Sequence, residues 1–521
     1  MGMVGAPEYH ERTKHAPGDF AGGGPGLNFE TLPRQFKAYR DRPVIDLSAV
    51  RAPKLPALSV VAETGADPLA GAEQTGRDGV DSATVASLCY YAAGVKGERT
   101  HPADVVDRRM SYRMASCTGN LHHIDLYVAC GDLDGLAAGV YHFDPATLSL
   151  DVLREGDRRD ALAAAAGDGS RVADAPVTVA VTSEWWRNAW KYRERTYRHA
   201  FWDSGTVLSH LVGTAHAFDL SASVVAGFDD RAVADLLGVD PETEAPLELV
   251  PVGSGVPAGE SSTGDARDAA PIDPATEPHP DHDRSHDLPY EAWAASSLSD
   301  GGAATEWRER VRDALPVGTV PAGNGERVAL DPVDHETASA RPLANTIRRR
   351  RSAREYAHEP ISRRRFATIL DRALRGVPLA AADGETLALN DAYVAVSAVE
   401  GIDQGVYQYL PDEPALERIG DADRRATQHA ALEQSPAAEA AANVYLLTDV
   451  EAVVDRLGDR GYRLAQLEAG VALGRLYLAT YAHRDLGGRG LTFFDDAVTD
   501  LLSPRAADQT PTTMFVLGHP K

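Results

Sequence analysis

The sequence predicts an α+β protein built from two tandem copies of one domain. Three observations lead to this fold class. Landmark motifs recur at a constant spacing, the same order of helices and strands can be read in both halves, and a polar segment rich in proline and glycine separates the halves.

The internal repeat is the strongest of these signals. Residues 125–128 read DLYV and residues 391–394 read DAYV, while residues 139–141 and 405–407 both read GVY. Three further landmarks follow in the same order at offsets of 265 or 266: Tyr197-Arg198 with Tyr462-Arg463, Gly205 with Gly470, and Phe228-Asp229-Asp230 with Phe494-Asp495-Asp496. A constant offset over five ordered landmarks indicates a tandem duplication.

The predicted elements follow the same order in both copies. Each copy begins with a helix, at about 82–93 or 362–375, and continues with a strand (DLYVA or DAYVAV), a turn (GVYHFD or GVYQYL) and a second strand (VTVAVT or NVYLLT). A long helix with apolar residues at helical spacing is next, at about 193–218 or 460–482. A short helix after the FDD motif and a last strand, LELVPVG or TMFVLG, close each copy. This order predicts helices packed on a mixed or antiparallel sheet.

Composition sets the expected boundaries. Residues 1–56 are predicted to be an irregular N-terminal segment, residues 57–254 are copy one and residues 331–521 are copy two. Residues 255–330 are predicted to be a largely flexible linker. Their first half is rich in Pro, Gly, Ser and Asp and poor in aromatic residues, so it cannot bury enough surface to offset the entropy of ordering.

The net charge of −25 narrows the range of partners. It disfavours nucleic acid and anionic membrane surfaces, because both require cationic side chains. Only six of the 52 basic residues are lysines. This acidic, lysine-poor composition fits a halophilic protein of a high-salt cytoplasm, where screening removes the self-repulsion. A GC-rich genome also replaces lysine by arginine and is the alternative explanation.

Metal and membrane signals are weak. Cys89, Cys117 and Cys130 are too few for a disulfide framework, and no pair has metal-ligand spacing. No apolar run reaches the roughly 20 residues that span a bilayer, and the N-terminus lacks the apolar core of a signal peptide. We therefore expect a soluble, cytoplasmic protein without a metal site.

A basic run, RRRRSAREY at residues 348–356, opens copy two. Several guanidinium groups beside a hydroxyl are suited to bind a phosphate through charge-assisted hydrogen bonds. The alternative is a solvated region that balances nearby acidic residues.

The segment MASCTGNLHH, residues 114–123, precedes the first strand of copy one. Small residues around a glycine let the backbone approach a ligand, and Thr118 and Asn120 can make polar contacts. The alternative is an ordinary loop. His122 and His123 form a weak metal pair, because adjacent strand side chains point to opposite faces and no third ligand is evident.

An aromatic and basic segment, WWRNAWKYRERTYR, spans residues 185–198. It can line a pocket for a planar ring, and Lys191 with Tyr192 can serve acid–base chemistry if buried, since desolvation lowers the pKa of a lysine. An aromatic packing surface is the alternative. The cluster GGRGLT at 487–492 indicates a helix C-cap and a close approach to a ligand, or merely a turn.

Four segments together resemble the nitroreductase superfamily, and within it the tandem members of the SagB-type (azoline oxidase-like) dehydrogenases. They are YHERTKH, SCTGNLHHIDLYV, WKYRERTYRHAFWDSG with the following GFDD, and RRRRSAREY. The resemblance covers nearly the whole chain outside the linker. It implies α+β sandwich domains that pair with FMN at their interface, so the two copies would form an intrachain pseudo-dimer that needs no second chain.

The resemblance also implies the site residues. Lys191 and Tyr192 match a pair that assists proton removal while FMN takes a hydride. The expected FMN contacts are Arg350, Arg351, Ser352, Arg354 and Lys521 at the phosphate and ribityl chain, Cys117, Thr118, Gly119 and Asn120 in the loop of copy one, and Gly490 and Leu491 near the flavin ring.

The two copies have lost opposite parts of this pattern. Copy one reads VVAETGADPLAGAEQTG where the Arg-x-Ser-x-Arg run is expected. Copy two is shorter before its first strand, where SCTGNLHH would recur, and reads DRGYRLAQ in place of the Lys-Tyr segment. The family draws the phosphate motif from one protomer and the loop from the other. The losses therefore leave one complete site, and the pseudo-symmetric second site is expected to be empty.

The functional prediction is an FMN-dependent oxidoreductase with one active site at the interface of the copies. It would transfer hydride between FMN and a small-molecule or peptide-heterocycle substrate, with NAD(P)H as a candidate donor. Two alternatives remain open: a degenerate flavin-binding scaffold without turnover, and a flavin-processing enzyme of the same fold.

Overall fold

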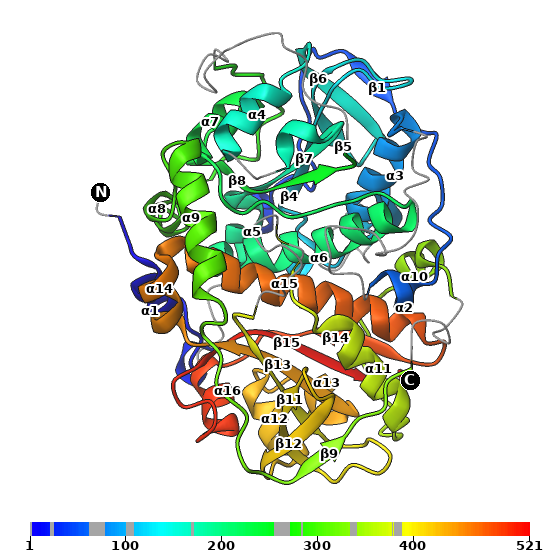
Figure 1. The fold of residues 1–521 in the computed structure, drawn as a ribbon, viewed down its shortest axis with the longest axis vertical. Coiled ribbons are helices and arrows are strands. Elements are labelled where there is room, and N and C mark those ends of the chain that lie inside the picture. The colour runs from blue at the N-terminus through cyan, green and yellow to red at the C-terminus, as the bar shows by residue number, and fades with distance from the viewer. Residues whose placement is uncertain are drawn as a thin grey trace.

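Two antiparallel sheets, one from each copy, enclose a central pair of long helices (Figure 1). The computed structural model describes residues 3–20, 26–61, 79–100, 109–167, 171–254, 271–282, 285–333, 341–377, 379 and 388–521. Every pair of named neighbouring strands is antiparallel. The prediction of an α+β protein made of two like domains is confirmed.

Copy one contributes a six-stranded sheet and the helices that cover it. In spatial order the strands are β1 (Val44–Asp46), β6 (Ser149–Glu155), β5 (Gly139–Asp144), β4 (Ile124–Cys130), β7 (Val177–Glu184) and β8 (Glu244–Val252). The helices are α2 (Ala57–Val60), α3 (Ser82–Ala93), α4 (Arg159–Ala166), α5 (Trp185–Tyr192), α6 (Thr196–Ala217) and α7 (Asp230–Leu237), and β2 (Val95–Thr100) pairs with β3 (Arg109–Arg113) beside them.

Copy two repeats this plan with seven strands. Their order is β14 (Gly487–Gly490), β15 (Thr510–Gly518), β13 (Ala442–Thr448), β10 (Asp391–Val396), β11 (Gly405–Leu410), β12 (Ala415–Gly420) and β9 (Arg327–Ala329). The helices are α10 (Leu343–Arg349), α11 (Arg363–Ala373), α12 (Arg424–Ala430), α13 (Ser435–Glu439), α14 (Val450–Leu457), α15 (Asp459–Ala482) and α16 (Asp495–Leu502).

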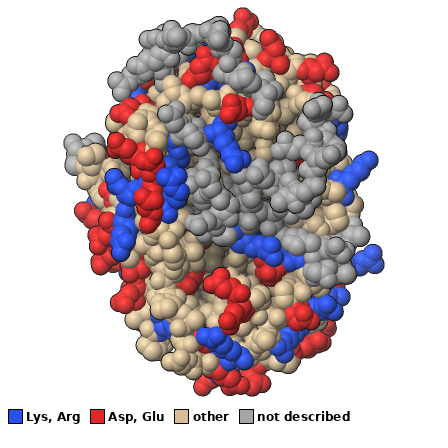
Figure 2. All heavy atoms as spheres, in the orientation of Figure 1, with Lys and Arg blue, Asp and Glu red and all other residues tan. Residues whose placement is uncertain are grey.

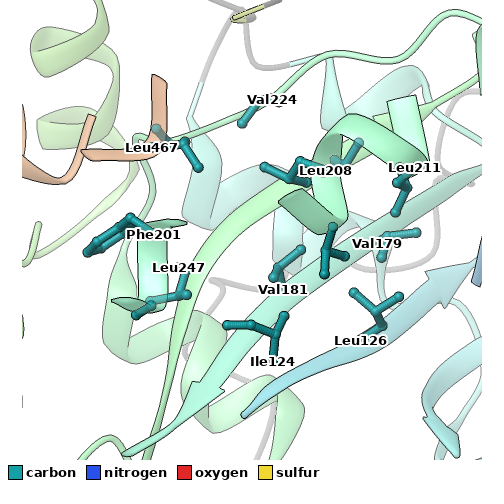
Figure 3. Packing of buried hydrophobic residues seen from close by; sticks show 14 of the residues in the cluster. Ile124, Leu126, Val179, Val181, Phe201, Leu208, Leu211, Val224, Leu247 and Leu467 are labelled. Carbon is teal, nitrogen blue, oxygen red and sulfur yellow. The ribbon is translucent and has the colours of Figure 1, made fainter. Parts of the chain in front are cut away.

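Alternating side chains give each sheet two buried faces. On β4, Leu126 and Val128 pack with α6 in one core, while Tyr127 and Ala129 pack with α4 and α7 in another. Figure 3 shows Leu126 and its neighbours below Leu208 of α6. Copy two has the same arrangement, with α11 and α15 on one face and α12, α13 and α16 on the other. Each copy is therefore a sheet between two helical layers.

The two copies meet where α6 crosses α15 at a pair of glycines. A Cβ atom added to Gly205 would lie 2.4 Å from the carbonyl carbon of Gly470, and one added to Gly470 would lie 2.3 Å from the backbone oxygen of Phe201. Only residues without a side chain allow the two backbones to approach this closely. The repeated glycines thus set the distance between the copies.

Reciprocal buried ion pairs flank this crossing. Arg195 and Arg198 of α6 bind the Asp495 carboxylate of copy two at 2.9 and 2.6 Å. Arg460 and Arg463 of α15 bind the Asp230 carboxylate of copy one at 2.5 and 2.6 Å. The equivalent aspartates are 265 residues apart, so the FDD landmark is displaced by one residue relative to its sequence alignment. Each copy supplies the counter-charge that the other copy needs.

The N-terminal segment is less irregular than predicted. It contains α1 (Ala6–Arg12), and β1 extends the first sheet. Tyr9 is fully buried, and the carbonyls of His10 and Thr13 accept hydrogen bonds of 2.6 Å from Arg198 and Arg195. The segment is therefore part of the junction between the copies.

The prediction of a largely flexible linker is wrong for its second half. Helices α8 (Leu288–Ala295) and α9 (Gly301–Ala314) lie there, while residues 255–270 and 283–284 are outside the described ranges. The buried Trp293 donates to the Pro246 carbonyl of copy one and the buried Trp307 to the Leu457 carbonyl of copy two, at 3.0 and 2.9 Å. The two tryptophans bury enough apolar surface to order this second half of the segment, although its first half is polar and poor in aromatic residues.

Two local predictions also fail. GVYHFD and GVYQYL are the strands β5 and β11, not turns, because their side chains alternate between the two cores of the sheet. The Gly487 cluster is the edge strand β14, not a helix C-cap, since α15 ends at Ala482 with His483 as its cap.

Acidic side chains are spread over both copies on the face shown in Figure 2, with basic side chains among them. None of the helices in the described ranges is both long and apolar enough to cross a membrane.

The glycine crossing can be tested by Gly205→Ala. The new methyl group would press on the backbone of α15, so we expect the free energy of unfolding to fall by about 1–3 kcal/mol. Gly213→Ala in the same helix is the control, because its Cβ would meet only side-chain atoms at 3.5 and 3.6 Å. The free energy of unfolding of Gly213→Ala should rise by up to about 1 kcal/mol, because alanine favours the helix more than glycine does. Urea denaturation of both variants measures the difference, and equal effects would contradict this role for Gly205.

The ion-pair junction can be tested by Asp495→Asn. This change leaves two buried guanidinium groups without a counter-charge, which should cost about 3–5 kcal/mol of stability at pH 7. Asp496→Asn is the matched control, since that carboxylate is 76% exposed and pairs only at the surface with Lys14.

The same pair predicts a pH dependence. Burial alone would raise the pKa of Asp495, but Arg195 and Arg198 hold it well below its usual value. The pair therefore stabilises the fold above about pH 4, the unfolded pKa of an aspartate, and this contribution is lost as the pH falls further. Acid unfolding curves of Asp495→Asn should lack that component, and an unchanged curve would exclude it.

Candidate functional site

The predicted phosphate-binding run lines a cavity of about 650 Å³ in copy two. The cavity lies where the chain leaves α10, and Tyr481, Leu486 and Pro520 form its apolar wall. Four of the predicted residues line it: Arg351, Ser352, Arg354 and Lys521. All four are exposed at the cavity surface. The tertiary structure thus gathers the C-terminal lysine with the basic run from 170 residues earlier.

The guanidinium groups of Arg351 and Arg354 are available to an anion. Within the described part of the chain, neither forms a side-chain hydrogen bond or ion pair. Their neighbour Arg349 differs, because it donates to the carbonyls of Tyr481, His483 and Arg484. Lys521 is 4.0 Å from Glu439, a weak contact that an anion could replace. Unpaired cations in a chain of net charge −25 indicate an anion-binding cavity.

Arg350 lies apart from this group. It is buried, and it donates to the carbonyls of Arg113, Met114 and Ala115 at 3.0–3.2 Å. These carbonyls belong to the segment of copy one that leads into Cys117. Arg350 therefore fixes the loop of copy one against the basic run of copy two, and its predicted contact with FMN stays a prediction.

Tyr477 connects the basic run to the glycine strand β14. Its hydroxyl accepts a hydrogen bond of 2.8 Å from the Gly490 amide and lies 3.3 Å from the Ser352 hydroxyl, while Arg350 stacks 5.5 Å from its ring. Leu491 follows, buried in the core on the outer face of the second sheet. Tyr477 could not be predicted from the sequence, because a buried tyrosine in a long apolar helix carries no local sign of such a role.

The loop of copy one is held by Asp203 of α6. The carboxylate accepts hydrogen bonds from the Thr118 amide and hydroxyl at 2.9–3.0 Å and from the Cys117 thiol at 3.2 Å. Asn120 donates to the Ser111 carbonyl at 3.0 Å. The Cys117 side chain therefore points towards Asp203, and only its backbone remains for a ligand in front of the loop.

Tyr192 packs on the same loop at Gly119. This glycine has a φ of 63°, and a Cβ atom there would lie 2.8 Å from the Tyr192 hydroxyl. Burial, followed by Asp203 and Cys117, raises the pKa of Tyr192, so its hydroxyl stays protonated at neutral pH. Lys191 holds its amine 5.1 Å from the Tyr192 ring centroid. Tyr192 therefore borders the loop, with the exposed Lys191 beside it, and the predicted roles of the two residues stay predictions.

Arg489 brings copy two to this pair. Partial burial and then the charge of Arg489 lower the pKa of Lys191, and Arg489 also opposes the upward shift at Tyr192. Arg489 is adjacent to Gly490 on β14. The charge of Arg489, on the glycine strand of copy two, therefore acts on the Lys-Tyr pair of copy one.

The pseudo-symmetric position is nearly filled. By the repeat offset, Val212 corresponds to Tyr477 and Val224 to Gly490. These valines line a mainly apolar cavity of about 10 Å³, formed in the described part of the chain with Val471 and Arg475. That volume is about the minimum for one water molecule. Of the segment VVAETGADPLAGAEQTG, residues 60–76, all but Val60 and Val61 lie outside the described ranges.

Lys96 is a further cation that the sequence analysis missed. It follows α3 on β2, and its amine donates to the Arg350 carbonyl. Burial, with Arg350 and Arg351 nearby, lowers its pKa to about 7. Its charge at neutral pH therefore depends on whether an anion is close.

The comparisons with known proteins agree with this architecture. The family model described as "Nitroreductase family" matches residues 80–254 and 347–519, which together make up more than half of the chain. A protein of Methanocaldococcus jannaschii that carries the provisional name nitroreductase is 31% identical over 170 residues, or 31% of this chain and 83% of that protein. The crystal structure of a provisionally named nitroreductase from Anabaena variabilis covers 100% of both chains with a TM-score of 0.76 and 24% identity, and shows the same fold.

Lys96 predicts a pH dependence of stability in the ligand-free protein. The unfolded lysine keeps its proton up to a pKa of about 10.4, whereas the folded one loses it near pH 7. The unfolded state binds more protons between these values, so stability should rise with pH over that range. In urea denaturation between pH 7 and pH 10, Lys96→Met should flatten the rise of the free energy of unfolding with pH. Lys54→Met, at an exposed lysine, should leave this rise unchanged. An unchanged slope in Lys96→Met would contradict the buried position of the amine.

Proposed function

The chain belongs to the nitroreductase family, and on that premise we propose that it is an FMN-dependent oxidoreductase with one active site shared between its two copies. The observation that carries the proposal is the junction at Tyr477 and Arg489. Tyr477 contacts Ser352 of the anion cavity and accepts a hydrogen bond from Gly490, while the charge of the neighbouring Arg489 acts on Lys191 and Tyr192; these contacts support one site that takes residues from both copies.

The described residues fit a flavin mononucleotide. Its phosphate would take the unpaired Arg351 and Arg354, with Ser352 and Lys521 beside them, because guanidinium forks bind phosphate oxygens in pairs. A cavity of about 650 Å³ lies in the range of cofactor sites. The flexible part of the ligand would pass Tyr477 towards Gly490. When bound, FMN supplies a ring system that accepts and returns hydride.

Lys191 and Tyr192 would handle the proton that accompanies hydride transfer. Lys191 is the better base of the two, since its lowered pKa leaves a larger fraction of neutral amine. Tyr192, whose raised pKa keeps it protonated, would donate a hydrogen bond to the substrate. Partial burial, followed by the charge of Arg489, lowers the pKa of Lys191. The two residues thus divide the roles of base and hydrogen-bond donor.

The substrate class follows the SagB-type likeness of the sequence. The WKYRERTYR segment, which carries Lys191 and Tyr192, supports a small molecule or a heterocycle of a modified peptide as substrate. NAD(P)H is the proposed source or acceptor of electrons for the other half-reaction.

A single site is supported by the contrast between the two pseudo-equivalent positions. Tyr477 contacts Ser352, which lines the open cavity of copy two, whereas Val212 and Val224 line a cavity of about 10 Å³ among the described residues. Flavin content tests this directly. We expect one FMN per chain after saturation and removal of the excess, and two FMN per chain would overturn the single-site proposal.

The phosphate cavity can be tested by Arg351→Ala and Arg354→Ala. Loss of a charge-assisted hydrogen bond costs about 1.5–3 kcal/mol, so each change should weaken FMN binding roughly 10- to 100-fold. Riboflavin, which lacks the phosphate, should bind wild type and variants alike. Arg364→Ala, an exposed arginine of α11 outside the cavity, is the matched control. Equal affinity for FMN in all four proteins would remove the cavity from the proposal.

Turnover distinguishes the proposed enzyme from its alternatives. The FMN-loaded protein should be bleached by NAD(P)H and recolour with an acceptor, and Lys191→Ala or Tyr192→Phe should slow turnover by roughly 100-fold or more while FMN stays bound. Unchanged turnover would exclude both residues. Tight FMN with no donor or acceptor in a broad panel would favour the scaffold, and breakdown of reduced FMN in air a flavin-processing enzyme.

A further inference from the structure

Three different metal-ligating side chains meet behind the loop of copy one. They are the Cys117 thiol before the loop turn, the His123 imidazole next to β4 and the Asp203 carboxylate on α6. Their ligand atoms all lie within 4.8 Å of one another. Asp203 Oδ2 is 3.2 Å from Cys117 Sγ and 2.8 Å from His123 Nε2. His123 and Asp203 are buried, and Cys117 is half-buried.

We propose that Cys117, His123 and Asp203 bind a divalent transition-metal ion, with Zn²⁺ as the best match. Zinc takes sulfur at about 2.3 Å and nitrogen or oxygen at about 2.0–2.2 Å in a tetrahedral arrangement. That geometry places neighbouring ligand atoms roughly 3.3–3.7 Å apart. The two separations from Asp203 need to widen by only a fraction of an ångström to admit the ion, and Cys117 Sγ and His123 Nε2 lie within 4.8 Å of each other. A thiolate ligand disfavours Mg²⁺ and Ca²⁺, which prefer oxygen.

Each ligand is already oriented by a hydrogen bond from outside the cluster. The second nitrogen of His123, Nδ1, is 2.8 Å from the Ser183 hydroxyl, which directs Nε2 towards the metal position. The His122 amide donates to Cys117 Sγ at 3.0 Å. The Thr118 amide and hydroxyl donate to Asp203. Supporting contacts of this kind fix the ligands and tune the affinity of metal sites.

The charges also call for a cation. Within the described residues no lysine or arginine forms an ion pair with the buried Asp203, which contacts the His123 imidazole and the Cys117 thiol. Binding of Zn²⁺ would displace the Cys117 thiol proton to solvent, leaving a thiolate and a carboxylate that together neutralise the ion. The neutral cluster would suit its buried position better than a lone carboxylate.

The fourth ligand position is left to water. The group contains no fourth His, Cys, Asp or Glu among the described residues. Tyr192 packs on the adjacent Gly119, so the ion would lie behind the loop that carries the proposed base and hydrogen-bond donor. This site does not depend on flavin binding. No local pattern in the sequence predicts the site, because Asp203 follows His123 by 80 residues.

Cobalt substitution tests the site in the full-length protein. After treatment with a chelator, titration with Co²⁺ should produce the ligand-field bands of a four-coordinate ion in the red part of the visible spectrum, where oxidised flavin does not absorb. The bands should saturate at one Co²⁺ per chain, and Zn²⁺ should remove them by competition. Absence of these bands at saturating Co²⁺ would overturn the proposal.

Substitutions test whether the Co²⁺ binds at this site rather than at other cysteines and histidines. Cys117→Ser and Asp203→Asn should lower Co²⁺ affinity by roughly 100-fold or more, and Ser183→Ala, which removes only the support of His123, by roughly 10- to 100-fold. His122→Gln is the matched control, because that side chain contacts the Ser111 carbonyl outside the cluster. Wild-type affinity in Ser183→Ala and Cys117→Ser would contradict the assignment, whether or not the Asp203 variant folds.

Discussion

The contact between α6 and α15 is the constraint on which the rest of the molecule depends. Two glycines let the backbones touch, and the buried ion pairs on either side lock the rotation of one helix against the other. Each sheet packs on its own long helix, so the crossing also fixes how the sheets face each other. The loop of copy one and the basic run of copy two approach each other only because this crossing brings them to the same side.

The duplication has kept symmetry in the scaffold and lost it in the site. Gly205 and Gly470 have the same role in the two copies, because a side chain on either would clash with the other helix. Asp230 and Asp495 are also equivalent, because loss of either carboxylate would leave buried arginines of the other copy without a counter-charge. The residues of the candidate site do not depend in this way on an equivalent residue in the other copy. Tyr477 and Val212 occupy equivalent positions. Tyr477 forms hydrogen bonds with Ser352 and Gly490, whereas Val212 packs against apolar side chains. In the proposed function a single interface serves binding, while the other stabilises the fold.

Arginine has two separate uses in this acidic chain. One group, Arg198, Arg350 and Arg463, is buried and donates hydrogen bonds to carbonyls and carboxylates of the other copy. These bonds hold the copies together. Arg351 and Arg354 stay exposed and unpaired within the described residues, which leaves their charge for a ligand. Adjacent residues of one basic run thus differ completely in burial and contacts, since the end of α10 turns Arg350 inward and its successors towards the cavity.

The sequence by itself determined the duplication, the α+β class and the main helices, because these depend on patterns that repeat along the chain; α3 begins and ends at the predicted residues. It also marked the loop, the Lys-Tyr pair and the basic run. Only the tertiary structure decided that GVYHFD is a strand, that the tryptophans of the supposed linker are buried and that Arg350 serves the scaffold. It alone joined Asp203 to Cys117 and His123. These outcomes depend on contacts between residues from tens to hundreds of positions apart, and the energy of burying or pairing such groups has no counterpart in local sequence.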